Sequence, residues 1–251
     1  MDIKLEVCTA SLEDCITSEK HGADRVELNS GFQLGGLTPS YGLIREVIKT
    51  LTIPIIVMIR PRPAGFCYSN NEFKVMQHDI EFALESGATG IATGVLNNNG
   101  SIDVKRCKMI KNQVGESELV FHRAFDVTPS PFEALEQLVD LGYNRVLTSG
   151  QKSKALEGSE LLSKLITKAK NRIEILPGSG ININSVVDIV KITGCTQVHA
   201  SLSHNSIDES TNNDRNISFS AVTSSPDFCY TETNPDAVKK MRQMLNSISN
   251  I

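Results

Sequence analysis

The sequence contains no tryptophan and few other aromatic residues, so aliphatic side chains must form most of any core. Its longest predominantly apolar run, from Ile53 to Ile59, contains a proline and falls far short of the roughly 18 residues that a membrane-spanning helix needs. The first residues alternate charged and apolar side chains and lack the apolar stretch of a secretory signal. We therefore expect a cytoplasmic protein with no membrane partner.

Polybasic runs and paired cysteine motifs are also missing. The 25 Lys and Arg residues are outnumbered by 29 Asp and Glu residues, and the net charge of -4 argues against a general nucleic-acid binder. The six cysteines contain no Cys-x-x-Cys pair, which excludes a zinc ribbon and a thioredoxin-like redox motif. In a reducing compartment these cysteines are expected to be free thiols.

What the sequence does contain is an alternation of short β-branched runs and helical periodicity, with a period of about 28 residues, the size of a βα unit. Eight strands are predicted to begin near Ile3, Arg25, Ile53, Gly90, Glu118, Arg145, Ile173 and Gln197. The predicted helices between them cover 11–21, 40–50, 71–86, 103–114, 131–141, 155–170 and 182–193.

Eight such units favour a single (β/α)₈ TIM-barrel domain over residues 1–251. The barrel is predicted over about 3–203, followed by a long polar loop over 204–233 and a C-terminal helix over about 235–248. A doubly wound sheet is the alternative. Its Gly-x-Gly-x-x-Gly fingerprint is missing after the first strand, where Cys8 begins the segment Cys-Thr-Ala-Ser.

In a barrel, the active site lies at the carboxyl ends of the strands, and alternate residues of each strand face the interior. This periodicity places Glu6 and Cys8 on the inner face of the first strand and Glu27 on that of the second. A buried carboxylate is costly unless it is paired or coordinated. Glu6 and Glu27 therefore require a partner from across the barrel.

Arg60 and Arg62, at the end of the third strand, have the charge for that role. They are two residues apart, so both guanidinium groups can point the same way and hold a carboxylate or phosphate ligand. An equally good interpretation is an internal salt network with Glu6 and Glu27 that only stabilises the barrel.

Two histidines are predicted at strand ends, His122 on the fifth and His199 on the eighth. Asp126 follows His122 by four residues and falls on the same face if the strand continues that far. A histidine beside a carboxylate can act as a general acid or base near neutral pH. Together with the glutamates and arginines, these residues predict a functional pocket rather than isolated structural histidines.

Ser149 ends the sixth strand, and Gly178 and Gly180 follow the seventh. The loops after the last strands of a barrel often bind phosphate through backbone N–H groups, so these three residues are candidates for binding a cofactor or other anionic ligand. Ordinary turn chemistry is the alternative explanation for both glycines.

Several segments in the same order resemble signatures of the copper homeostasis protein CutC family. They are 5–8, 22–28, 35–40, 57–62, 121–126 and 147–151. The resemblance implies a TIM barrel, commonly a homodimer, with a cytoplasmic role in copper binding or copper tolerance. It implies that Cys8 is a copper ligand, whereas Asn29 stands where animal relatives have the second proposed cysteine.

Two functions therefore remain open. The resemblance and Cys8 favour a copper homeostasis protein whose partner is a copper ion. The charged residues instead suit an enzyme of unknown reaction acting on a small anionic substrate, a phosphate or a carboxylate. A regulatory module that senses such an anion is a third interpretation. Cu(I) usually requires at least two soft ligands, so Cys8 would need a further donor to hold it.

Overall fold

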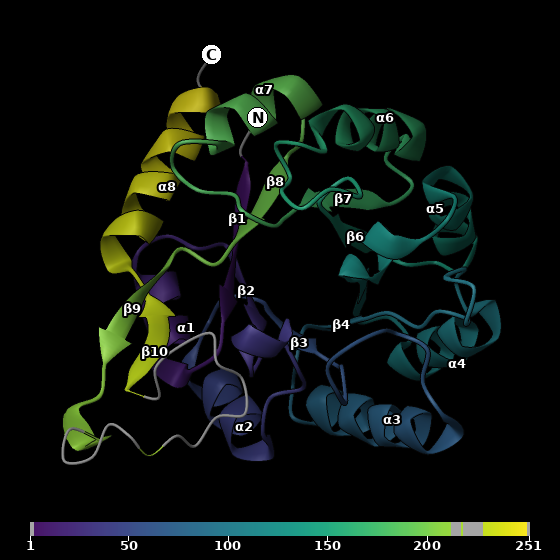
Figure 1. Cartoon of the computed structure of the whole chain (residues 1–251), viewed down its shortest axis with the longest axis horizontal. Coiled ribbons are helices and arrows are strands. Elements are labelled where there is room, and N and C mark those ends of the chain that lie inside the picture. The colour runs from purple at the N-terminus through teal and green to yellow at the C-terminus, as the bar shows by residue number, and fades with distance from the viewer. Residues whose placement is uncertain (1–2, 212–216, 218–227, 250–251) are drawn as a thin grey trace.

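The computed structural model describes residues 3–211, 217 and 228–249. Eight parallel strands form a nearly closed barrel in the order β7-β6-β5-β4-β3-β2-β1-β8, with β7 next to β8, and the helices surround it (Figure 1). The strands are Lys4–Thr9 (β1), Arg25–Leu28 (β2), Ile55–Met58 (β3), Gly90–Thr93 (β4), Glu118–Phe121 (β5), Arg145–Thr148 (β6), Glu174–Pro177 (β7) and Gln197–Ala200 (β8). The TIM-barrel prediction is confirmed.

The helices follow the strands as the periodicity predicts. They are Leu12–Lys20 (α1), Tyr41–Thr50 (α2), Asn70–Glu85 (α3), Val104–Val114 (α4), Pro131–Asp140 (α5), Ser159–Ala169 (α6), Val186–Thr193 (α7) and Pro235–Ser249 (α8). Side-chain oxygens satisfy free backbone N–H groups at several helix starts. Ser69, for example, forms a reciprocal capping box with Glu72 at the start of α3. Helix α6 begins later than predicted, because turns occupy residues 151–158.

Alternate strand residues divide the apolar side chains between two cores. One set packs between the barrel and the surrounding helices, and it includes Ile55 and Val57 of β3. The second, smaller cluster lies inside the barrel and consists of Ile56, Met58, Ala92, Val120, Leu147 and Leu176. On β3 to β7, this apolar layer lies between the amino ends of the strands and their carboxyl ends, where the pocket described below opens.

The segment after β8 differs from the predicted long loop. Residues Ser203–Ile207 (β9) and Cys229–Thr233 (β10) pair as antiparallel strands, and a short 3-10 helix (η3) covers Glu209–Thr211. The polar composition concealed these strands, because they lie at the surface and have no apolar face. The middle of the predicted loop, 212–216 and 218–227, lies outside the described residues.

The last strand and helix pack against the beginning of the chain. The Thr233 N–H donates to Asp14 of α1, and the Arg242 guanidinium of α8 donates to the carbonyls of Ile3 and Gly22. Helix α8 lies along the outside of the barrel near β1 and α7 (Figure 1). Within the described residues, no helix combines the length and the hydrophobicity needed to cross a membrane.

Gly90 provides a test of packing between β4 and β5. A Cβ atom at this position would lie 2.4 Å from the Glu118 carbonyl oxygen, whereas one at Gly42 in α2 would have nothing within 4 Å. We expect Gly90→Ala to lower the free energy of unfolding by about 1–3 kcal/mol or more. The matched Gly42→Ala should raise it by about 0.5 kcal/mol. Denaturant unfolding measures both, and equal effects would contradict the packing.

Candidate functional site

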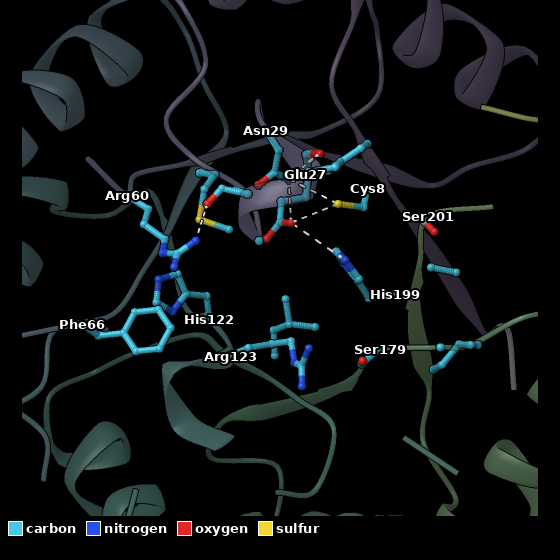
Figure 2. Close-up of a pocket in the computed structure, with 18 residues that line it drawn as sticks. Cys8, Glu27, Asn29, Arg60, Phe66, His122, Arg123, Ser179, His199 and Ser201 are labelled. Atoms are coloured by element: carbon cyan, nitrogen blue, oxygen red, sulfur yellow. Dashed lines mark hydrogen bonds and ion pairs between the residues drawn. The ribbon is translucent and has the colours of Figure 1, made fainter. Parts of the chain in front are cut away.

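A pocket of about 220 Å³ opens at the carboxyl ends of the strands (Figure 2). Its lining comes from the inner faces of β1, β2, β3, β6 and β8 and from the loops that follow β2, β3, β5, β7 and β8. The walls combine apolar surface with a few charged and polar groups, which is typical of small-molecule sites in barrels. The pocket contains Cys8, Glu27, Arg60, His122, Gly180 and His199 of the predicted site residues.

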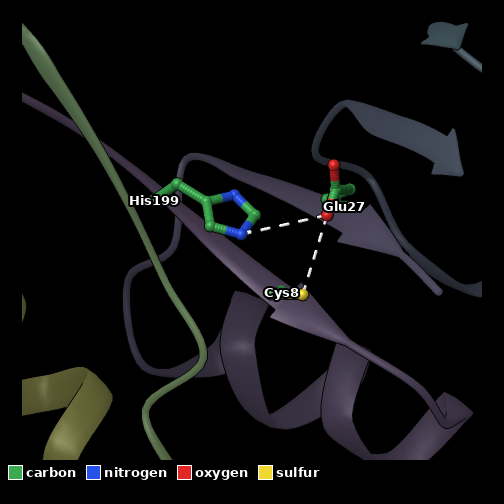
Figure 3. Close-up of side chains that lie close together, drawn as sticks. All are labelled: Cys8, Glu27 and His199. Atoms are coloured by element: carbon green, nitrogen blue, oxygen red, sulfur yellow. Dashed lines mark hydrogen bonds and ion pairs between the residues drawn. The ribbon is translucent and has the colours of Figure 1, made fainter. Parts of the chain in front are cut away.

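Cys8, Glu27 and His199 form a cluster on one wall (Figure 3). The Cys8 thiol donates to Glu27 Oε2 at 3.6 Å, and His199 Nε2 lies 3.8 Å from the same oxygen. One potential ligand atom from each residue lies within 4.8 Å of the others. Sulfur, imidazole and carboxylate groups so arranged can hold a transition-metal ion.

Glu6 contacts the side of the His199 ring that faces away from the pocket. Its carboxylate is paired with the Arg25 guanidinium, and its Oε1 lies 2.7 Å from His199 Nδ1. Burial alone would raise the pKa of Glu6, but Arg25 and His199 hold it well below its usual range. The ionised Glu6 therefore accepts a hydrogen bond from the His199 Nδ1–H and leaves His199 Nε2 facing the pocket. A carboxylate behind a histidine is a common arrangement at metal sites.

A buried polar network continues from Arg25 around the amino ends of the strands. Arg25 donates to Gln197, Gln197 donates to Glu174, and Arg145 donates to both Glu174 and Glu118. The salt network considered as an alternative, in which Arg60 and Arg62 pair with Glu6 and Glu27, is not formed; a different buried network is present, and its cations are Arg25 and Arg145. Arg60 and Arg62 do not pair with Glu6 or Glu27, because Arg60 donates to loop carbonyls and Arg62 pairs with Glu72.

Burial and the neighbouring charges set the pKa values of the three groups in the cluster. Burial, together with the Glu6 carboxylate, raises the pKa of Glu27 above its ordinary value, although His199 and Asn29 oppose the shift. Burial lowers the pKa of His199, but Glu27 and Glu6 outweigh it and raise the value. Burial and the Glu27 carboxylate raise the pKa of the Cys8 thiol well above its usual range.

Asn29 supports the cluster without adding a second thiol. Its side-chain amide donates to Glu27 Oε2 at 2.9 Å and to the Cys8 sulfur at 3.3 Å. The asparagine therefore occupies the position that the resemblance assigns to a second cysteine and holds Cys8 and Glu27 by hydrogen bonds. The other two groups of the cluster are an imidazole and a carboxylate.

Arg60 and His122 lie on the wall opposite this cluster, beside Phe66 (Figure 2). Arg60 donates to the backbone carbonyls of Leu34 and Gly36, each at 2.9 Å, and to that of Ala64 at 2.7 Å. Burial and the nearby Arg60 charge lower the pKa of His122 to about 3, so its imidazole is neutral at physiological pH.

Arg123 also lines the pocket and was not among the predicted residues. Its guanidinium pairs with Asp126 at 2.8 Å and donates to the Ser149 hydroxyl at 3.1 Å. The sequence could have pointed to Arg123, because it directly follows His122 at the predicted end of the fifth strand. If alternate strand residues face inward and His122 does so, however, Arg123 should face outward. Strand β5 ends at Phe121, and a short 3-10 helix (η2) over Arg123–Val127 turns the arginine back over the pocket.

Arg62 lies outside the pocket, contrary to the expectation that it points the same way as Arg60. It pairs with Glu72 at the start of α3 and donates to carbonyls of its own loop. Strand β3 ends at Met58, so the alternation of inner and outer faces no longer applies at position 62.

Asp126 and Ser149 do not line the pocket either. Asp126 lies in η2, away from the predicted strand face of His122, and accepts hydrogen bonds from the hydroxyls of Thr148 and Ser149. Both residues position Arg123.

The two predicted glycines differ in their surroundings. A Cβ atom at Gly178 would lie 2.5 Å from Leu147, so this glycine allows close packing at the end of β7. Gly180 lines the pocket together with Ser179, and both have positive φ angles.

These features define a TIM-barrel protein with an open pocket at the carboxyl ends of its strands and a Cys, His and Glu cluster in one wall. The CutC family model matches residues 3–204. The chain belongs to the CutC family.

Relatives in other organisms agree. The chain is 47% identical over 198 residues to a family protein CutC of Treponema denticola, covering 79% of this chain and 80% of that protein. It is 44% identical over 197 residues to the human protein named copper homeostasis protein cutC homolog, covering 78% and 72% of the two chains. A solved structure of a CutC protein from Streptococcus agalactiae has a TM-score of 0.76 and 35% identity, and it covers 79% of this chain and 98% of its own.

The buried neutral His122 gives a prediction for acid stability. Its pKa is near 6.5 in the unfolded chain and about 3 in the folded protein, so between these values only the unfolded chain binds the proton. Stability must therefore fall as the pH falls through this window. We expect His122→Phe to reduce the slope of unfolding free energy against pH by about 1.4 kcal/mol per pH unit between pH 6 and 4.

Denaturant unfolding at a series of pH values measures this slope. The matched control is His78→Phe, whose side chain is exposed on α3. A His122→Phe slope equal to that of the unsubstituted protein would contradict a buried, neutral His122.

Proposed function

We propose that this protein acts in copper homeostasis by binding one copper ion at the cluster of Cys8, Glu27 and His199. The observation that carries the proposal is the convergence of three ligand atoms within 4.8 Å in the wall of an open pocket. The relatives named as copper homeostasis proteins, which share over 40% identity across most of the chain, support the choice of metal.

The donor set accounts for a site with a single cysteine. A thiolate and an imidazole are both ligands that copper accepts, and the carboxylate of Glu27 adds a third donor. Asn29 removes the second sulfur but keeps the remaining donors in place through its hydrogen bonds to Cys8 and Glu27. We infer that His199, rather than a second thiolate, completes the pair of stronger ligands.

The alternative of an enzyme acting on a small anion is not favoured, since the relatives that match the barrel carry the copper homeostasis name. The homodimer and the cytoplasmic location that the resemblance implies stay predictions.

Titration of the reduced protein with Cu(I) against a competing chelator tests the site. We expect one copper ion per chain, and Cys8→Ser should weaken its binding by at least about tenfold, or 1.4 kcal/mol. Cys67→Ser is the matched control, because the Cys67 side chain is exposed and contacts Asn98 outside the pocket. Equal affinities of the two variants would contradict the assignment, as would binding of zinc without binding of copper.

Glu6 is expected to act on the metal through His199. Glu6→Gln removes the charge that holds the Nδ1 proton, and loss of such a partner typically weakens metal binding by about 10–100-fold. Thermal unfolding separates this effect from loss of fold, since Arg25 also loses its partner. An unchanged copper affinity in the folded variant would show that Glu6 serves the barrel alone.

A further inference from the structure

The loops that follow β6 and β7 are joined at the rim of the pocket. The Ser179 carbonyl accepts the Ala155 N–H, and its hydroxyl donates to the Ser153 carbonyl, each at 2.9 Å. Ser179 and Gly180 both line the pocket and have positive φ angles of 81° and 69°. A serine rarely adopts this conformation, so its two hydrogen bonds help to stabilise the loop in this shape.

This loop and the end of β8 carry hydrogen-bond donors at the pocket. Gly180 and Ser201 line it, and both residues are exposed. Neither of their backbone N–H groups, nor the Ser201 hydroxyl, donates to any residue that the structure describes. Because both residues are exposed, a molecule in the pocket can reach these donors.

Arg123 brings a cationic side chain to the same rim. It lines the pocket, and its side chain is 44% exposed. Its Nε and one terminal nitrogen donate to Asp126 and Ser149, whereas the other terminal nitrogen donates to no described residue. Figure 2 shows Arg123 on the side of the pocket where Ser179 lies. Asp126 and Ser149 therefore hold the guanidinium in place and leave part of it available to a ligand.

Lys154 adds a second cation beside Gly180. A Cβ atom at Gly180 would lie 3.0 Å from Lys154 Cγ, so the lysine stem packs next to this glycine. Lys154 is exposed, and it forms no ion pair with a carboxylate in the described part of the chain. Since Asp126 already neutralises Arg123, Lys154 gives this rim an uncompensated positive charge.

These groups suit a phosphate better than a carboxylate. A phosphate monoester has three terminal oxygens and close to two negative charges at neutral pH, whereas a carboxylate has two oxygens and a single charge. The rim offers neutral donors from two loops and cationic side chains from two others. In barrels, the loops that follow the seventh and eighth strands frequently bind phosphate.

The rest of the pocket limits the body of the ligand. The cavity of about 220 Å³ is smaller than the roughly 300–1,000 Å³ of pockets for drug-sized molecules. Met58, Leu147 and Ile181 give it apolar surface. An organic part of a few carbon atoms would fill the space between the rim and the opposite wall.

We propose that this rim binds the phosphate group of a small phosphomonoester. The Gly180 and Ser201 N–H groups and the Ser201 hydroxyl donate to the phosphate oxygens, and Arg123 and Lys154 supply the positive charge. The organic part extends into the pocket towards the metal cluster. Binding at the rim requires no metal, so it does not depend on the copper function.

The direct test follows the backbone amides of the unsubstituted, metal-free, ¹⁵N-labelled protein by NMR. Glycerol 3-phosphate should shift the Gly180 and Ser201 signals saturably, and glycerol should leave them unchanged. Lactate at equal ionic strength should bind about tenfold more weakly, because it has one charge and fewer acceptors. Inorganic phosphate should shift the same two signals and bind more weakly than the ester, because it lacks the organic part.

Three results would each overturn the proposal. They are absence of a saturable shift with glycerol 3-phosphate, equally tight binding of lactate, and tighter binding of inorganic phosphate than of the ester.

Variants locate the site by calorimetric titration with glycerol 3-phosphate. Arg123→Gln should weaken binding about tenfold or more, because a charged hydrogen bond is lost. Lys154→Gln should weaken it about threefold, since an exposed charge contributes less. The matched control is Lys164→Gln, an exposed lysine on α6 that pairs with Glu160, and it should bind as the unsubstituted protein does.

Losses no larger than that of the control would overturn the assignment. Thermal unfolding identifies a variant that fails to fold, and the NMR experiment on the unsubstituted protein then decides the question.

The same preparations separate this site from the copper function. Glycerol 3-phosphate is titrated into metal-free protein, and copper is titrated into protein without the ester. Copper binding without binding of the ester would contradict only the phosphate site. Binding of the ester without copper binding would contradict only the proposed copper function.

Discussion

The buried ion pair between Glu6 and Arg25 is the constraint on which the interior of this barrel depends. The two residues are direct neighbours in the register of β1 and β2, and each is at least nine-tenths buried. Neither charge is tolerable inside the barrel without the other. Because Arg25 fixes the Glu6 carboxylate, Glu6 can hold the His199 ring in one orientation. This orientation directs His199 Nε2 into the wall of the pocket.

Much of this arrangement was predictable from the alternation of residues along each strand. The inner faces assigned to β1 and β2 place Glu6, Cys8 and Glu27 inside the barrel, where the structure has them. His199, the third of the four residues of β8, reaches the same wall of the pocket. The period of the βα units predicted the ring that brings these strands together. The alternation did not predict which cationic side chain would pair with which carboxylate.

The remaining features could not be predicted because alternation ends where a strand ends. Arg62 lies beyond β3 and turns outward to Glu72, whereas Arg123 lies beyond β5 and is turned back by η2. The same loss of register separates Asp126 from His122. The role of Gly178 depends on its contact with Leu147 of the neighbouring strand β6, which turn chemistry alone cannot reveal. The surface strands β9 and β10 lack the apolar periodicity that identifies a strand.

Arg60 limits how far the entrance of the pocket can widen. Its three hydrogen bonds tie together the loops that follow β2 and β3, at Leu34, Gly36 and Ala64. Widening the entrance on this side would break charge-assisted bonds inside a buried layer. This side of the mouth is therefore rigid, and its width is set by the lengths of the two loops that Arg60 ties together. A molecule wider than this opening could pass only if those hydrogen bonds were broken.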